Sequence, residues 1–189
     1  MNDTRTIFLI GKPGCGKGTQ AKLLAEKTGW QVITAGDQFR ALAAEDTPVG
    51  HKTKMEIDAG LLVPHWFAMY LFLKALFSVE EGKSVIFDGF SRKVPEAELI
   101  IDSLRWLNRP FTMLHLAVSD DEVRHRLALR KSVEGRVDDN AIEERLTEYH
   151  TYTEPAILKF SDAHKLIEIN GEQMPEAIAA DIDKALEVA

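Results

Sequence analysis

The chain has 189 residues, enough for one domain with a complete hydrophobic core. Its formal net charge of −7 argues against a general affinity for nucleic acid or for an anionic membrane surface, so any anionic ligand must be held by cations gathered locally. The single cysteine cannot form a disulfide within the chain, and no apolar run suits a signal peptide or approaches the roughly 20 residues of a spanning helix. These properties predict a soluble, cytoplasmic protein.

Short apolar segments alternate with longer helical patterns along the chain, which is typical of βαβ units. The expected strands are 6–10, 31–33, 84–88, 111–118 and 165–169, and their apolar character predicts a parallel sheet covered on both faces. The expected helices are 17–28, 37–44, 49–59, 65–78, 95–107, 120–130, 140–159 and 175–187. The three tryptophans and the aromatic segment 66–77 are expected to be helix core rather than a surface on which bases stack.

Two intervals interrupt this alternation. The interval between the second and third strands is longer than a single crossover helix requires, so residues 34–63 are expected to form a small helical insertion. The polar segment 131–140 separates two expected helices and is predicted to be a loop.

A glycine-rich segment, "GKPGCGKGTQ" at 11–20, follows the first strand and opens the first helix. This is the context of a P-loop, in which backbone N–H groups and a helix N-terminus surround phosphate oxygens and Lys17 reaches the outer phosphates. Gly18 follows the lysine directly, so Thr19 is the nearest hydroxyl for Mg²⁺. The alternative is a glycine-rich turn without a ligand. The residues expected to bind ATP here are Gly11, Gly14, Cys15, Gly16, Lys17, Gly18 and Thr19.

Six further motifs follow the P-loop: "ITAGDQFRA" (33–41), "AGLLVP" (59–64), "DGFSR" (88–92), "RLALR" (126–130), "GRVDDN" (135–140) and "RLTEY" (145–149). In these motifs and in their order, the sequence resembles the adenylate kinase family, the nucleoside monophosphate kinases. The resemblance implies a P-loop kinase fold with a five-stranded parallel sheet and helices on both faces. It implies a core domain of 1–33, 64–130 and 140–189, a nucleoside monophosphate (NMP)-binding insertion at 34–63 and a short lid at 131–139.

The implied reaction is transfer of the γ-phosphoryl group of ATP to a nucleoside monophosphate, most often AMP, with Mg²⁺ as cofactor, in a monomer. A phosphate's second pKa is about 6, so the attacking oxygen is already ionised and needs no general base. Positioning and neutralisation of charge then carry most of the catalysis, and guanidinium groups suit both tasks.

Six arginines stand at motif positions, whereas a lone arginine would be interpreted as part of a surface ion pair. The resemblance assigns Arg40 and Arg92 to the monophosphate. It assigns Arg126 to the ATP site, near the base of ATP. The residues around the transferred group are expected to be Lys17, Arg92, Arg130, Arg136 and Arg145, with Arg130 also contacting ATP.

Asp88 ends the third strand, at the carboxyl edge where open α/β sheets bind ligands. It is expected to hold Mg²⁺, through water, with Thr19 as a further candidate; the alternative is a carboxylate that caps a turn. The expected acceptor-binding residues are Ala35, Gly36, Arg40, Val63, Gly89, Arg92 and Glu96.

Three positions depart from the family pattern, and all are near the expected acceptor site. Ser91 replaces a proline that follows a cis peptide bond in the family; a cis bond before serine costs about 3 kcal/mol or more, so either strain is stored or the turn relaxes and Arg92 is re-aimed. Ala35 replaces a threonine near the base, and Glu96 replaces a glutamine that reads adenine. An ionised glutamate only accepts hydrogen bonds, which favours guanine or uracil over adenine unless Glu96 is solvated, protonated or partnered through water.

The alternatives to an AMP kinase are therefore a kinase that prefers GMP or UMP/CMP, and a nucleotide sensor with little turnover. The complete set of Lys17 and motif arginines argues against a sensor, because binding alone does not require all of them.

Overall fold

The computed structural model describes residues 4–134 and 141–188. Five strands form one sheet in the order β2-β3-β1-β4-β5, and every neighbouring pair is parallel. The five-stranded parallel sheet expected from the sequence is thus confirmed. Its strands are β1 (Thr6–Gly11), β2 (Gln31–Thr34), β3 (Val85–Asp88), β4 (Phe111–Ala117) and β5 (Leu166–Asn170).

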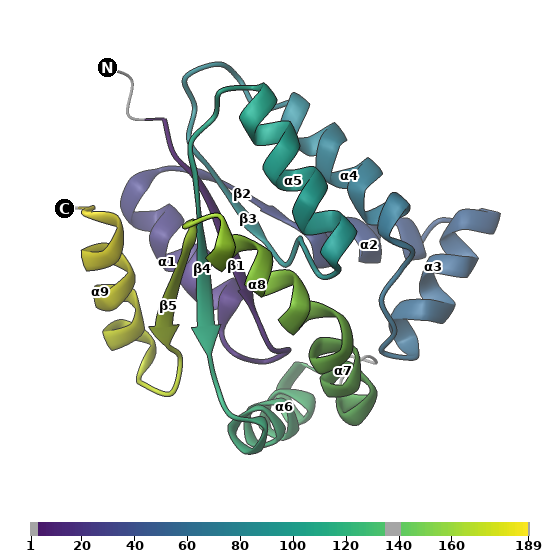
Figure 1. The fold of residues 1–189 in the computed structure, drawn as a ribbon. Coiled ribbons are helices and arrows are strands. Elements are labelled where there is room, and N and C mark those ends of the chain that lie inside the picture. The colour runs from purple at the N-terminus through teal and green to yellow at the C-terminus, as the bar shows by residue number, and fades with distance from the viewer. Residues whose placement is uncertain (1–3, 135–140, 189) are drawn as a thin grey trace.

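Helices cover both faces of the sheet (Figure 1). Because alternate residues of each strand point to opposite faces, each strand contributes side chains to two cores. Phe8 packs into a core formed with α4 (His65–Phe77), α5 (Val94–Trp106) and α8 (Glu154–Asp162). Its neighbour Leu9 packs into a second core formed with α1 (Lys17–Thr28), α6 (Asp120–Glu134) and α9 (Pro175–Leu186). Both strand faces are apolar for this reason.

The insertion after β2 contains two helices, α2 (Ala35–Ala43) and α3 (Pro48–Asp58), and α3 projects at the edge of the molecule in Figure 1. Helix α2 begins two residues earlier than predicted. Thr47 caps α3, with its side chain accepting a hydrogen bond from the N–H of Gly50 at 3.0 Å.

The helix predicted at 140–159 is a composite. Helix α7 (Ile142–Glu148) continues into a π-helical turn, η2 (Tyr149–Thr153), and then into α8. Pro155 lies in the first turn of α8, where its missing N–H removes one intrahelical hydrogen bond and favours the wider turn just before it. Helix α6 also runs to Glu134, four residues beyond the predicted end and directly before a glycine in the sequence, so residues 131–134 are helical rather than loop.

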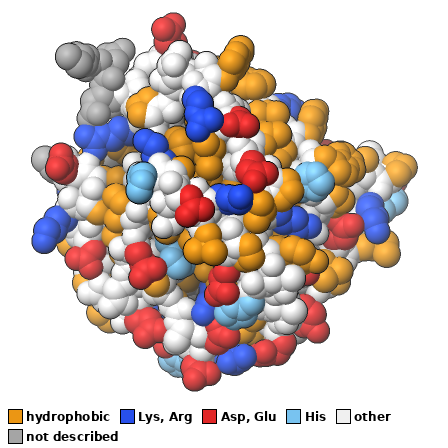
Figure 2. All heavy atoms as spheres, viewed as in Figure 1, with side chains coloured by type: hydrophobic (Ala, Val, Ile, Leu, Met, Phe, Trp, Pro, Cys, Tyr) orange, Lys and Arg blue, Asp and Glu red, His pale blue; other side chains and the backbone are white. Residues whose placement is uncertain are grey.

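Helix α4 lies only partly in the core. Phe72 is buried, but Trp66, Tyr70 and Phe77 are more than half exposed, so the expectation that this aromatic segment lies mainly in the core is wrong for one helix face. Trp106, at the end of α5, is also exposed. None of the described helices is long and apolar enough to cross a membrane. Acidic and basic side chains are interspersed on the face shown in Figure 2.

Candidate active site

The turn between β1 and α1 forms a backbone cradle around the Lys17 ammonium group. Lys17 Nζ donates hydrogen bonds to the carbonyl oxygens of Gly11 and Lys12, each at 2.8 Å, and lies 3.4 Å from Cys15 Sγ. Burial, together with the nearby Arg92 charge, lowers the pKa of Lys17. Gly14 has φ +76°, and a Cβ there would lie 2.8 Å from the Leu127 side chain on α6. The loop thus admits only glycine at that position, and it packs closely on the helix that carries Arg126.

A cavity of about 300 Å³ lies between the insertion and the carboxyl end of β3. Its wall includes the predicted acceptor-binding residues Ala35, Gly36, Arg40, Val63, Gly89, Arg92 and Glu96. Phe39 and Phe90 contribute apolar surface, and Ala35 is almost fully buried. A small, mostly apolar cavity edged by arginines suits a flat ring attached to an anionic group.

A larger cavity of about 1200 Å³ lies beside the P-loop. Of the predicted ATP-binding residues, Gly14, Gly16, Lys17, Gly18, Thr19, Arg126 and Arg130 line it. Gly11 and Cys15 line neither cavity; Gly11 ends β1 and Cys15 is fully buried. Arg126 is held by Glu122 at 2.6 Å and by the carbonyl oxygen of Gly171 at 2.9 Å.

Three predicted arginines, Arg40, Arg92 and Arg145, line both cavities. They come from α2, from the turn after β3 and from α7, so segments far apart in the sequence meet at this junction. Arg40 also pairs with Asp37 at 2.6 Å, and its side chain is 45% exposed. The junction concentrates positive charge where the two cavities meet, despite the acidic balance of the whole chain.

Asp88 lies at the edge of the larger cavity, 7% exposed, and its Oδ1 has no hydrogen-bond partner among the described residues. Burial raises the pKa of Asp88, and the charges of Lys17 and Arg92 oppose that rise. The described residues contain no cluster of three metal-binding side chains. A single orphaned carboxylate oxygen beside a phosphate cradle fits Mg²⁺, which commonly takes one or two carboxylates together with water and substrate phosphates.

The turn that carries Arg92 is built without a cis peptide bond among the described residues. Ser91 instead adopts a left-handed backbone with φ +69°, and it is fully buried with no partner for its hydroxyl oxygen. The strained cis bond, one of the two alternatives drawn from the sequence, is not observed; the strain lies instead in the left-handed backbone of Ser91. Proline cannot adopt this φ, so the departure at this position matches a different local backbone.

Glu96 lies in the first turn of α5, 2% exposed, and its Oε2 accepts a hydrogen bond from the backbone N–H of Arg92 at 2.6 Å. Burial raises the pKa of Glu96, whereas this hydrogen bond and the Arg92 charge lower it. The alternative that Glu96 is a solvated helix residue is therefore wrong, because its carboxylate is buried and has a protein partner.

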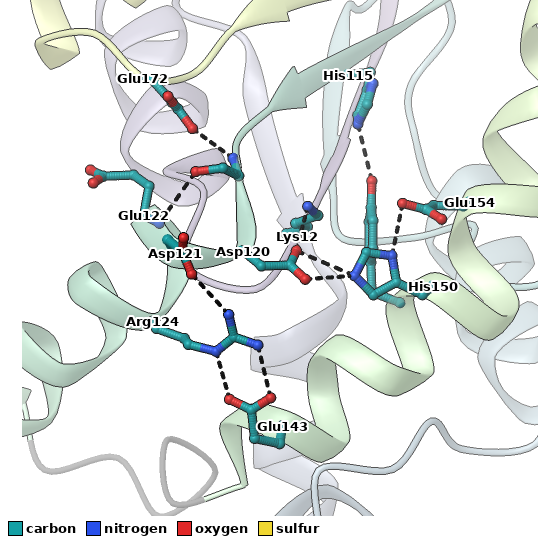
Figure 3. Close-up of polar contacts among 12 residues, drawn as sticks. Lys12, His115, Asp120, Asp121, Glu122, Arg124, Glu143, His150, Glu154 and Glu172 are labelled. Atoms are coloured by element: carbon teal, nitrogen blue, oxygen red, sulfur yellow. Dashed lines mark hydrogen bonds and ion pairs between the residues drawn. The ribbon is translucent and has the colours of Figure 1, made fainter.

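A charged network links three segments that carry predicted site residues (Figure 3). Lys12 of the P-loop pairs with Asp120 at 2.5 Å, at the start of α6. His150 of η2 lies between Asp120 at 3.0 Å and Glu154 at 2.9 Å, as Figure 3 shows. Hydrogen bonds to Asp120, and to a lesser extent to Glu154, raise the pKa of His150. The network therefore ties the P-loop to the helices of Arg126 and Arg145.

The same view shows a second link between these helices. Arg124 of α6 forms two hydrogen bonds with Glu143 of α7, at 2.8 and 3.0 Å. This pair therefore links the helix that leads into the predicted lid with the helix that follows it.

Several residues in and beside the acceptor cavity are not among the predicted site residues. Glu148 lines this cavity, and its Oε2 accepts from the N–H of Leu62 at 3.0 Å. Lys93 lies outside the cavity lining, but its Nζ donates to the carbonyl oxygen of Val63, a residue of the cavity wall, at 3.1 Å. Thr153 also lines this cavity. The one available signal was spacing, since Glu148 follows Arg145 by three residues and so shares its helix face. Arg136 and the predicted lid positions 135–139 lie outside the described residues.

Known proteins match this chain over most of its length. The family model described as "Adenylate kinase" matches residues 9–165. The chain belongs to the adenylate kinase family. It is therefore a phosphotransferase, and at the level of the family a nucleoside monophosphate kinase.

Individual relatives agree with this assignment. An adenylate kinase of Phocaeicola vulgatus is 38% identical over 184 residues, covering 96% of this chain and 97% of the relative. An adenylate kinase of Bacteroides fragilis is 37% identical with the same coverage. A protein called adenylate kinase 1 from Nostoc sp. is 38% identical over 186 residues, covering 97% and 98% of the two chains.

Proposed function

We propose that this member of the adenylate kinase family transfers the γ-phosphoryl group of ATP to AMP and forms two molecules of ADP, with Mg²⁺. The observation that carries the proposal is the junction of Arg40, Arg92 and Arg145, which line both cavities. Two polyanions can approach each other only where such charge is gathered. The relatives are named adenylate kinases, which supports AMP as the acceptor.

ATP is assigned to the larger cavity and the monophosphate to the smaller one. The P-loop N–H groups and the N-terminus of α1 bind the ATP phosphates, and Lys17 exchanges its carbonyl partners for phosphate oxygens. Arg126 lies against the ATP base, and Arg130 and Arg136 act on the transferred group. Ala35, Gly36 and Val63 form the acceptor-base site, with Gly89 close to the acceptor phosphate.

In the transfer step, an ionised oxygen of the AMP phosphate forms a bond to the γ-phosphorus as the bond from that phosphorus to the β–γ bridging oxygen breaks. The bridging oxygen keeps the electron pair and leaves as part of ADP. Arg92 holds the attacking phosphate in line, and Lys17 and Arg145 neutralise charge on the moving group. Asp88, with Thr19 as a further candidate, would hold Mg²⁺. Bound Mg²⁺ neutralises charge on the β- and γ-phosphates.

Closure over the substrates keeps water from the γ-phosphate. We assign this role to the insertion 34–63 and the short lid 131–139, with 1–33, 64–130 and 140–189 as the core that they close upon. The contact of Glu148 with Leu62 supports the assignment, because it joins the insertion's last segment to the helix that follows the lid.

A panel of acceptors tests the choice of AMP. Initial rates of ADP formation are measured with Mg-ATP and each of AMP, GMP, UMP and CMP. We expect the highest kcat/KM with AMP. A higher kcat/KM with GMP, UMP or CMP would replace AMP in the proposal, and nucleotide binding without turnover would point to a sensor.

A further inference from the structure

Three hydrogen bonds hold the backbone and the side chain of Arg92. Its N–H donates to Glu96 Oε2 at 2.6 Å, and its carbonyl oxygen accepts from Thr153 Oγ1 at 3.2 Å. Its Nε donates to the carbonyl oxygen of Gly89 at 3.0 Å. Because Arg92 lines both cavities, these bonds fix it at the junction of the two predicted ligands.

The turn before Arg92 depends on such anchors. Ser91 has a left-handed backbone, which a residue other than glycine keeps only where its surroundings enforce it. Glu96, at the third position of α5, reaches back to the N–H group of Arg92, one residue before the N-cap Lys93, whereas a capping-box glutamate binds the N–H of the N-cap itself. Glu96 and Thr153 are each only 2% exposed, so neither bond competes freely with water.

Thr153 holds the turn through the carbonyl oxygen of Arg92. It closes the π-helical segment η2, which continues the helix of Arg145. One helical segment thus carries Arg145 and, through Thr153, holds Arg92.

We infer that Glu96 and Thr153 are positioning residues for Arg92, and that Glu96 acts on the acceptor's phosphate through Arg92 instead of reading the acceptor's base. The inference rests on the proposed function, in which Arg92 binds that phosphate. The two roles of Glu96 predict different kinetics. A residue that aims Arg92 affects every monophosphate alike, because all carry the same phosphate, whereas a residue that reads the base changes the preference among bases.

The kinetic test compares Glu96→Leu, Glu96→Gln, Thr153→Val and Thr153→Ser with the unaltered protein, using AMP, GMP and UMP as acceptors. For Glu96→Leu we expect kcat/KM to fall about 10-fold or more by the same factor for each acceptor, with the KM for ATP unchanged. Glu96→Gln keeps an acceptor oxygen and should recover most of the loss. Thr153→Val should show a smaller uniform loss that Thr153→Ser restores. A changed preference among the bases in Glu96→Gln, or no loss in Glu96→Leu, would overturn the inference.

A measurement in the free protein separates this inference from the proposed function. The ¹⁵N–¹H signal of Arg92 Nε is assigned by its loss in Arg92→Lys and compared in all variants. We expect it to shift or broaden in Glu96→Leu and Thr153→Val. It should stay unchanged in Glu98→Gln, the matched control on the exposed side of α5. An unchanged signal in folded Glu96→Leu refutes positioning even if the enzyme is active, and a shifted signal supports it even if AMP is not the acceptor. Glu96→Ala, which also removes the acceptor oxygens, gives the same comparison should Glu96→Leu fail to fold.

Discussion

The protein is predicted to be less stable with its natural Ser91 than with glycine at that position. Its left-handed backbone costs a residue with a Cβ about 1–2 kcal/mol, and its buried hydroxyl oxygen has no partner among the described residues, which costs about 1–3 kcal/mol more. Glycine avoids both costs. Its greater conformational freedom in the unfolded chain, however, lowers the free energy of unfolding by about 0.4–1 kcal/mol. We therefore expect Ser91→Gly to raise the free energy of unfolding by about 1 kcal/mol or more, which for this length raises Tm by about 2–4 °C per kcal/mol.

Urea unfolding followed by circular dichroism measures this change, and Ser91→Ala separates the two contributions. Alanine removes the hydroxyl but keeps the Cβ, so Ser91→Ala should be less stable than Ser91→Gly by about 0.5–1 kcal/mol. Ser91→Pro is the opposite perturbation, because proline fixes φ near −65°, and it should destabilise the protein. If Ser91→Gly is no more stable than Ser91→Ala, the left-handed turn is not the conformation in solution. If both are less stable than the natural protein, the hydroxyl has a partner.

Three further predictions concern the junction, the metal and pH. Arg92→Lys keeps the charge but loses the planar fork, so kcat/KM for AMP should fall by about 100-fold or more while Tm stays nearly constant; wild-type kcat/KM would contradict the role of Arg92. Asp88→Asn removes a buried carboxylate whose pKa is raised, so it should increase stability at pH 8 while raising the Mg²⁺ concentration needed for half-maximal activity; an unchanged Mg²⁺ requirement would exclude Asp88 as the metal residue. The pKa of His150 is raised, chiefly by Asp120, so its contribution to stability is complete below about pH 6.5 and is lost as pH rises through the folded-state value. Between pH 6 and pH 9 the Tm of His150→Gln should therefore fall less than that of the natural protein, and equal falls would show that the network in Figure 3 does not depend on the His150 charge.

Much of the fold could be predicted from the sequence because its signals are local. The strands are short apolar segments, and the P-loop glycines and Lys17 lie within one turn. The boundaries that were missed depend on less local effects. Pro155 widens the helix before it into η2, and α6 continues to Glu134 although its last turn is polar.

The site was predicted as a set of residues, but the hydrogen bonds among them were not. The sequence places Ser91 and Glu96 five residues apart and suggests a change in base recognition. The structure gives Glu96 a protein partner, the Arg92 N–H, which only the path of the turn could reveal. The hydrogen bond from Thr153 to Arg92 joins residues 61 positions apart, and no local pattern indicates such a contact.

The exposed aromatic residues of α4 show a similar limit. The apolar composition of this segment predicts that Trp66, Tyr70 and Phe77 lie in the core, since large apolar side chains are usually buried. Burial depends on which helix face meets the sheet, and the other face of α4 already supplies Phe72 and its neighbours to the core.

The central claim, direct transfer between two nucleotides, is tested most directly by ³¹P NMR of a reaction with Mg-ATP, with and without AMP. We predict that ATP and AMP disappear in equal amounts, that only ADP appears, and that ATP persists when AMP is left out. Release of inorganic phosphate from ATP without AMP, or no transfer at all in the presence of both nucleotides, would contradict the account.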